Sequence, residues 1–248
     1  MKIIFVRWLL LRDQSRGGTR VPEPTRSVSC QALAALLEGA AAGKFPPADG
    51  GVEILAQPGE RDAGVISFTG FAVVFADTDP GWIAGELPAD DLSAPLSVAF
   101  LHALGQRLGR QPGDIDMLTC AAPLPGAPPR ELMLAEIDPT VQHTRIARAL
   151  RYRDDVRAWQ TAGGVIVLGR GVAGRWETAI EVDPQYRSAG LGSRLASAAR
   201  QLVPDSSPVW AQISPGNAAS IRAFLRAGFR PIGGESLMTP ARADPGQT

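Results

Sequence analysis

One stretch of the chain constrains the fold more than any other, because its pattern changes within a few residues. Residues 176–182 (WETAIEV) read as a β-strand, and Asp183 and Pro184 then turn the chain. The segment 187–192 (RSAGLG) leads directly into a helical pattern over residues 190–202, with leucine and alanine recurring on one face. The sequence therefore predicts a strand, a tight turn and a helix in immediate succession.

The start of this helix has the chemistry of an anion site. The first backbone N–H groups of a helix have no partner within the helix, and the helix dipole adds positive potential there. Gly190 and Gly192 let a ligand approach the backbone closely, and Arg187 adds a cation with several donors. A pyrophosphate fits this arrangement. The alternative is that the two glycines only let the helix pack close to the sheet.

The same stretch resembles motif A of the GNAT superfamily of acyl-coenzyme A-dependent N-acyltransferases. That motif is a strand and a Val-x-Pro turn, followed by Arg/Gln-x-x-Gly-x-Gly/Ala at the opening of a helix. The matching residues are Val182, Pro184, Arg187, Gly190 and Gly192.

A second segment resembles motif B of the same family, which is a strand, an asparagine, a helix with an aromatic residue seven positions on, and Gly-Phe. The matching parts are residues 209–213, Asn217, Phe224, Gly228 and Phe229. Two motifs in this order and at this separation identify residues 130–240 as similar to a GNAT domain.

The resemblance implies a mixed α/β (α+β) fold, in which a largely antiparallel central sheet is flanked by helices. It implies acetyl-coenzyme A as co-substrate, no metal, and a primary amine of a small molecule, peptide or protein as acceptor. In this family the pantetheine arm pairs with the strand before motif A like an added strand, which places the thioester near residues 178–182. The amine then attacks the thioester directly in a ternary complex.

The resemblance also implies roles for individual residues. A backbone N–H near Val182 would polarise the acyl carbonyl, and the amides from Arg187 to Ser193 would hold the pyrophosphate. Asn217 has two interpretations of equal weight, contact with the cofactor arm or the N-cap of the second helix. The expected cofactor-binding residues are Val182, Arg187, Ser188, Ala189, Gly190, Leu191, Gly192, Ser193, Asn217 and Phe224.

The amine must be deprotonated to react, so a base is needed near the thioester. Relatives often carry Glu or His at two strand positions that are Trp176 and Thr178 here. Glu177 and Glu181 lie on the same strand and are the candidate catalytic residues, although alternation points them to the opposite face unless a bulge intervenes. The alternatives are that both glutamates are solvated or ion-paired, and that His143 on the preceding helix is the base.

The general acid is also missing from its usual place. Many relatives carry a tyrosine in the motif B helix that protonates the leaving thiolate, whereas Phe224 stands there in this chain. Ser220, one turn earlier, is a substitute candidate. Two hypotheses follow: an active N-acetyltransferase, or a non-catalytic acyl-coenzyme A-binding sensor or regulatory module.

The rest of the chain is organised around this region. We expect a leader or linker over residues 1–29, a smaller α+β domain over residues 30–121, the GNAT domain over residues 130–240 and a tail over residues 241–248. The proline-rich segment 122–129 marks the boundary between the two domains. The first domain carries no motif with an assignable chemistry. One interpretation is a degenerate half of a GNAT-like fold.

The expected secondary structure follows from apolar periodicity and from glycine and proline positions. The expected strands are residues 51–56, 66–76, 115–121, 131–137, 156–160, 165–170, 176–182, 209–213, 229–232 and 236–238. The expected helices are residues 31–42, 95–108, 140–151, 190–202 and 217–227, with a short one near Asp79. The three strands between residues 156 and 182 should form an antiparallel meander.

Composition narrows the function classes. The 25 basic and 25 acidic residues give a formal net charge of zero, which argues against a nucleic-acid-binding surface over the whole chain. Two distant cysteines favour a reduced, cytoplasmic protein, and two histidines exclude a histidine-rich metal site. The apolar run at the N-terminus is interrupted by Arg7 and is too short for a membrane span. Oligomeric state stays open, a homodimer included.

Overall fold

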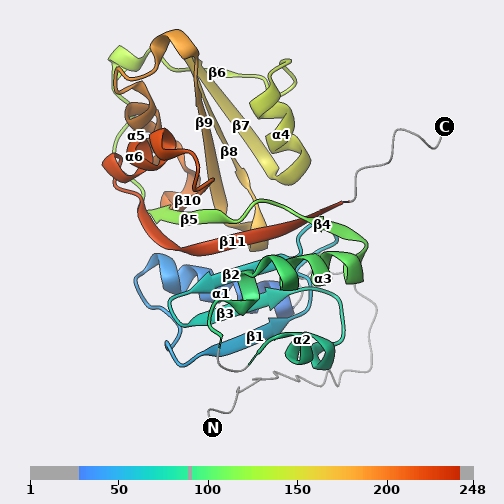
Figure 1. The fold of residues 1–248 in the computed structure, drawn as a ribbon. Helices are drawn as coiled ribbons and strands as arrows, with labels where there is room; N and C mark the ends of the chain where they lie inside the picture. The colour runs from blue at the N-terminus through green and yellow to red at the C-terminus, as the bar shows by residue number, and fades with distance from the viewer. Residues whose placement is uncertain (1–27, 89–90, 241–248) are drawn as a thin grey trace, which may run out of the picture. The chain divides into compact units, whose positions relative to one another are not determined.

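A computed structural model describes residues 28–88 and 91–240 of the chain (Figure 1). The predicted tail and nearly all of the predicted leader lie outside these residues. The described chain divides into two compact units. The first unit contains residues 28–36, 45–88, 91–114 and 236–240, and the second contains residues 37–44 and 115–235.

The first unit is a small α+β structure. Its strands are β1 (Gly51–Leu55), β2 (Gly64–Phe68), β3 (Phe71–Phe75), β4 (Arg110–Pro112) and the end of β11 (Arg230–Pro240), in the order β1-β3-β2-β11 with β4 also on β11. Its helices are most of α1 (Val28–Ala41), α2 (Pro80–Glu86) and α3 (Val98–Leu108), the last preceded by a 3₁₀ turn (Ala94–Leu96). Phe100, Leu101 and Leu104 of α3 pack on the sheet and form the core of this unit.

The hairpin β2–β3 corrects one sequence prediction. Residues 66–76 were expected to form a single strand, but the chain reverses between Phe68 and Phe71. Gly70 has a φ of 66°, a conformation that glycine adopts without strain. The run of β-branched and aromatic residues on both sides of the turn concealed this break.

The second unit is built on a seven-stranded portion of sheet. Its strands are β5 (Asp116–Ala121), β6 (Ala135–Ile137), β7 (Asp154–Thr161), β8 (Gly164–Arg170), β9 (Trp176–Val182), β10 (Val209–Ile213) and the beginning of β11. Their order is β11-β5-β10-β9-β8-β7-β6, and the pair β10–β9 is parallel while the others are antiparallel. The predicted meander is confirmed as β7, β8 and β9.

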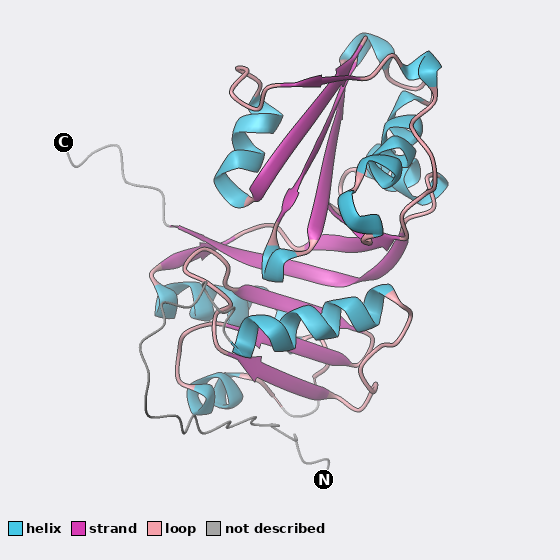
Figure 2. Ribbon diagram, turned by 180° about the vertical axis from the view of Figure 1, so that it is seen from behind, coloured by secondary structure: helices cyan, strands magenta, loops and turns pink. Residues whose placement is uncertain are grey.

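Helices cover both faces of this sheet, as Figures 1 and 2 show. α5 (Leu191–Leu202) and α6 (Ala218–Arg226) pack through Leu191, Leu195 and Phe224 against one face. α4 (Thr144–Tyr152) packs through Ile146 and Ala149 against the other face. The mixed, largely antiparallel sheet flanked by helices confirms the predicted fold class.

Several element boundaries differ from the sequence prediction, among them the three that follow. The segment 131–137 begins as a 3₁₀ turn, so only Ala135–Ile137 pairs as strand β6. α4 starts at Thr144 because His143 caps it. The two expected segments near the C-terminus form one strand, β11, with an irregular register between Pro231 and Gly233.

The two units do not coincide with the predicted domain ranges. β5 lies in the second unit, although its residues fall within the range 30–121, and β11 passes from the second unit into the first. The predicted domain ranges stay a prediction. Among the described residues, no helix is long and apolar enough to cross a membrane.

Candidate active site

The two central strands of the second unit separate soon after they meet. β9 and β10 pair at only two positions, Trp176 with Val209 and Glu177 with Trp210. β9 nevertheless continues to Val182, and its other edge pairs with β8 over its full length. Figure 1 shows β9 and β10 running apart from their shared end. Within residues 28–88 and 91–240, the edge of β9 over residues 178–182 therefore has no strand beside it on the β10 side, which leaves backbone groups for another extended chain to pair with.

α5 begins where β9 and its turn end, and its first turn is not capped by a side chain. Gly190 is the N-cap, with a φ of 80° and a ψ of 0°. In α2, α3, α4 and α6 a backbone N–H of the first turn donates a hydrogen bond to the N-cap side chain, so α5 is the exception among these five described helices. Its N-terminal N–H groups are free to bind an anion.

Arg187 is fixed beside this helix start. Its Nε donates to the carbonyl oxygen of Val182 over 3.1 Å, and the residue is exposed. Ser188 has a φ of 64°, an uncommon conformation for a residue other than glycine. The loop thus holds a guanidinium group and a strained turn next to the free N–H groups, which fits an anion-binding loop.

Packing does not account for the two motif glycines. A Cβ atom at Gly190 would meet nothing within 4 Å, and one at Gly192 would lie 3.4 Å from Cβ of Ala223, an ordinary contact. Gly190 is instead favoured by its positive φ. The alternative that both glycines serve close helix packing is therefore not supported at these positions.

Glu177 is buried in a network of ion pairs. Its Oε1 accepts from Arg175 Nε at 2.8 Å, and its Oε2 accepts from Arg153 Nε at 3.0 Å. Burial raises the pKa of Glu177, but the two guanidinium groups outweigh burial and hold the pKa below its ordinary value. A carboxylate that is ionised, buried and shared between two arginines is poorly suited to accept a proton from an amine.

Glu181 has a more open environment on the same strand. Its Oε2 lies 3.3 Å from Arg145 Nε on α4, and the side chains are 35% and 37% exposed, respectively. The side chains of Glu177 and Glu181 both lie on the face of the sheet that α4 covers, opposite the face that α5 covers. This agrees with the alternation expected from the sequence. Glu181 is the candidate base that solvent and an amine can reach.

The other residues considered for proton transfer have structural partners. Trp176 lies in the core under Arg170, whose Cζ is 4.4 Å from the ring centroid. Thr178 is buried and donates to the carbonyl oxygen of Val167. His143 caps α4, with its Nδ1 accepting from the N–H of Arg145 at 3.2 Å.

The motif B residues lie on α6 and at its start. Asn217 caps the helix, with its Oδ1 accepting from the N–H of Ser220 at 3.0 Å. Phe224 is buried and packs edge-to-face against Phe229, with ring centroids 4.8 Å apart. The cap explains Asn217 without a ligand, and Phe224 contributes to the core beneath α5 and α6.

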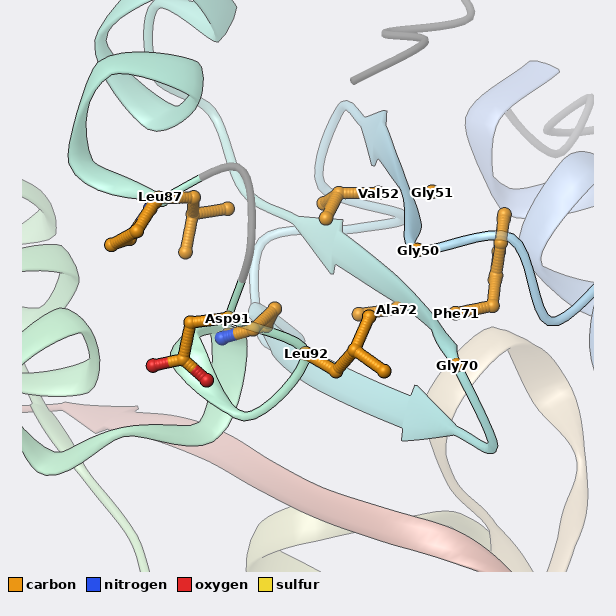
Figure 3. Close-up of a pocket in the computed structure, with 11 residues that line it drawn as sticks. Gly50, Gly51, Val52, Gly70, Phe71, Ala72, Leu87, Asp91 and Leu92 are labelled. Atoms are coloured by element: carbon orange, nitrogen blue, oxygen red, sulfur yellow. The ribbon is translucent and has the colours of Figure 1, made fainter. Parts of the chain in front are cut away.

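A small cavity in the first unit is a weaker candidate for a functional site. It lies among Gly50, Gly51, Gly70 and Leu87, with a cavity volume of about 20 Å³. That is room for about one water molecule and too little for a coenzyme. Figure 3 shows the nearby Asp91 carboxylate turned away from the three glycines, and this group instead accepts from the N–H and Oγ of Ser93.

Comparison with protein families decides what the strand–loop–helix site belongs to. Residues 137–229 match the model of the acetyltransferase (GNAT) family, and this range includes β9, the loop and both motif helices. This region is a GNAT acetyltransferase domain. The protein is therefore an acyltransferase, and acyl-coenzyme A is the co-substrate of its family.

Two solved structures are similar to this chain. A GCN5-related N-acetyltransferase from Kribbella flavida has 15% identity and a TM-score of 0.39, with 86% of this chain and 96% of that chain covered. A tandem GNAT protein from the clavulanic acid biosynthesis pathway has 16% identity and a TM-score of 0.33, with 74% and 65% covered. No curated protein matches the chain.

Sequence reasoning missed the partners of Glu177. Three side chains from separate parts of the chain contact the Glu177 carboxylate, namely Arg153, Arg175 and Gln212. Glu235 lies next to this group and pairs with Arg175. The two-residue spacing of Arg175, just before β9, and Glu177, within it, is a weak signal for an ion pair. Nothing in the sequence indicates that Gln212 and Glu235 join them.

Gly171 makes room for this network, which gives a stability prediction. A Cβ atom at Gly171 would overlap the Glu177 carboxylate, and the backbone there (φ −101°, ψ −138°) lies outside the regions that other residues favour. We expect Gly171→Ala to lower the free energy of unfolding by about 1–3 kcal/mol because the network must shift. Gly85→Ala, where a Cβ meets nothing within 4 Å, is the control and should not destabilise. Equal unfolding midpoints in urea for Gly171→Ala and wild type would contradict this packing argument.

Proposed function

We propose that this protein transfers the acetyl group of acetyl-coenzyme A directly to a primary amine. The observation that carries the proposal is the unpaired edge of β9 beside the uncapped start of α5. The unpaired strand edge can bind an extended pantetheine arm, and the helix start can bind a pyrophosphate. The two features are adjacent, as the two parts of one coenzyme molecule require.

The proposed cofactor contacts follow from these elements. The N–H groups of the loop and first turn, residues 187–193, would bind the pyrophosphate, with Arg187 adding a cation. The N–H near Val182, at the end of β9, would stabilise the oxyanion that forms on the acyl carbonyl. Asn217 and Phe224 would shape the site through the position of α6, since one caps this helix and the other anchors it.

We propose Glu181 as the group that removes the proton from the amine, directly or through water. Glu177, the other candidate, is held by two arginines. Phe224 cannot protonate the thiolate, so that proton would come from the solvent or from Ser220, which is partly buried one turn earlier on α6.

Glu181→Gln is expected to lower kcat about 10²–10⁴-fold, since general base catalysis contributes that much. The substitution keeps the shape of the side chain and removes the base. The rate should then rise with pH only as the free amine itself deprotonates. Rates measured between pH 6 and 10 test this, and a wild-type pH profile with an unchanged kcat would exclude Glu181 as the base.

Direct transfer also predicts that no cysteine carries the acetyl group. Cys120 is 3% exposed, and burial raises the pKa of its thiol to about 12 although Arg175 and Arg230 oppose the shift. A thiol in this state is a poor nucleophile at neutral pH. We expect Cys120→Ala to keep kcat within about threefold, since the loss of one small buried side chain spares the site. Acetylated Cys120 trapped by mass spectrometry would contradict direct transfer.

The experiment that tests the proposed function measures free coenzyme A released from acetyl-coenzyme A in the presence of a panel of primary amines. Acceptors should include amino acids, polyamines, aminoglycosides and peptide N-termini. Propionyl- and succinyl-coenzyme A serve as donor controls for acetyl specificity. Amine-dependent release that is fastest with the acetyl donor is the expected result. Coenzyme binding without release by any amine would favour the sensor hypothesis instead.

A further inference from the structure

A cluster of side chains joins β9, β10 and β11 in the second unit, and we call Arg175, Glu177, Gln212 and Glu235 the clasp. Arg175 Nη2 lies 2.9 and 2.8 Å from the two carboxylate oxygens of Glu235. Gln212 Nε2 donates to Glu177 Oε1 at 3.1 Å and to Glu235 Oε2 at 2.9 Å. With the Arg175–Glu177 ion pair, these contacts form a closed set across three strands.

The clasp lies where β9 and β10 stop pairing. Glu177 belongs to the last backbone pair, opposite Trp210. Gln212 lies two residues further along β10, so its side chain is on the same face as that of Trp210. Beyond the last backbone pair, the hydrogen bond from Gln212 Nε2 to Glu177 therefore links β10 to β9.

The composition of the clasp is hard to explain by stability alone. The side chains of Arg175, Glu177 and Glu235 are only 4%, 5% and 1% exposed. Buried ion pairs of this kind are often no more stabilising than apolar residues of the same volume, because desolvation opposes the attraction. Arg153 completes the charge balance by pairing with Glu177 at 3.0 Å. Directional hydrogen bonds do, however, fix the geometry between the strands that they join.

We propose that the clasp sets the opening between β9 and β10 that admits the pantetheine arm, and that its members are positioning residues for the thioester. This inference rests on the proposed function. It has a specific consequence, since the pantetheine arm enters the opening whereas the nucleotide and pyrophosphate bind at the start of α5. Weakening the clasp should lower the affinity for ligands that carry the pantetheine arm and leave the affinity for ligands without it unchanged.

Gln212→Met is the variant that isolates this effect. It keeps the length of the side chain, removes both amide donors and the amide oxygen that accepts from Arg153 Nη2 at 3.5 Å, and replaces no member of an ion pair. Gln160→Met is the matched control, because Gln160 is exposed on β7. Gln212→Ala removes the same donors with less bulk and replaces Gln212→Met if methionine is not accommodated. Circular dichroism and thermal melting verify that each variant is folded.

Two probes are titrated into each protein by calorimetry. Coenzyme A carries the pantetheine arm, and 3′-phosphoadenosine 5′-diphosphate carries the same nucleotide and pyrophosphate without it. We expect Gln212→Met to raise the Kd of coenzyme A about tenfold and to leave the Kd of the nucleotide within twofold of wild type, with Gln160→Met unchanged for both.

The outcomes separate the clasp from the proposed function. If Gln212→Met lowers the affinity for both probes equally, or for neither, the clasp does not set the opening and the inference is overturned. If folded wild type binds neither probe, the proposed function itself fails and the inference falls with it. Selective loss of coenzyme A affinity supports both.

Discussion

Gly190→Asp is expected to weaken acetyl-coenzyme A binding at least a hundredfold, whereas Gly190→Asn should weaken it less than tenfold. The position has open space for a side chain, so neither variant should clash with the protein. The φ of 80° is one that Asn and Asp tolerate better than most residues. The two side chains have the same shape and differ in charge. The difference in affinity therefore reports whether an anion binds at the start of α5.

The expected size follows from electrostatics. Two unit charges about 4 Å apart repel by about 4 kcal/mol at the effective dielectric constant of a protein surface. A hundredfold loss in affinity corresponds to about 2.8 kcal/mol, which is within that repulsion. Calorimetric titration of both folded variants measures the difference. Similar affinities for the Asp and Asn variants would show that the pyrophosphate does not bind beside residue 190.

Glu177→Gln is expected to lower the free energy of unfolding by about 3–5 kcal/mol at pH 7. The substitution leaves Arg175 and Arg153 without the carboxylate they share, and removing one member of a buried ion pair costs about this much. Glu181→Gln, on the same strand, removes a partly exposed pair with Arg145 and should cost less than about 1 kcal/mol. Urea unfolding of the two variants provides the comparison.

The effect of pH on this difference has a defined sign. The pKa of Glu177 is lowered in the folded protein, so its ionised form stabilises the fold above the unfolded pKa, near the ordinary value of 4.5. That contribution is lost as the pH falls through the folded pKa. The gap between wild type and Glu177→Gln should therefore be constant near neutrality and narrow below about pH 4.5. A gap that widens in acid would contradict the ion-pair account.

Local patterns predicted the strand, the turn and the helix of the proposed coenzyme site well, because these elements are contiguous in sequence. β9 and β10 have the predicted bounds, and α5 starts one residue after Gly190. The uncapped N-terminus of α5 follows from having glycine at its N-cap, which the sequence displays directly. The early separation of β9 and β10 does not follow from the sequence alone, because strand pairing depends on distant parts of the chain.

The failures have physical causes that the sequence does not reveal. The hairpin turn at Gly70 was hidden because uninterrupted β-forming residues flank it. Arg153 and Glu235 are far apart in the chain and meet in one cluster only because β7, β9, β10 and β11 come together in the second unit. Alternation placed Glu177 and Glu181 on one face, but only the structure shows that Glu177 is buried between two arginines whereas Glu181 is partly exposed.

The measurement that tests the account most directly is calorimetric titration of acetyl-coenzyme A into the folded wild-type protein. We expect saturable binding at one site per chain, competed by free coenzyme A. No heat of binding from a protein that is shown to be folded would contradict it. β9, the loop and α5 would then be a strand–turn–helix unit that has the fold of the family without its co-substrate.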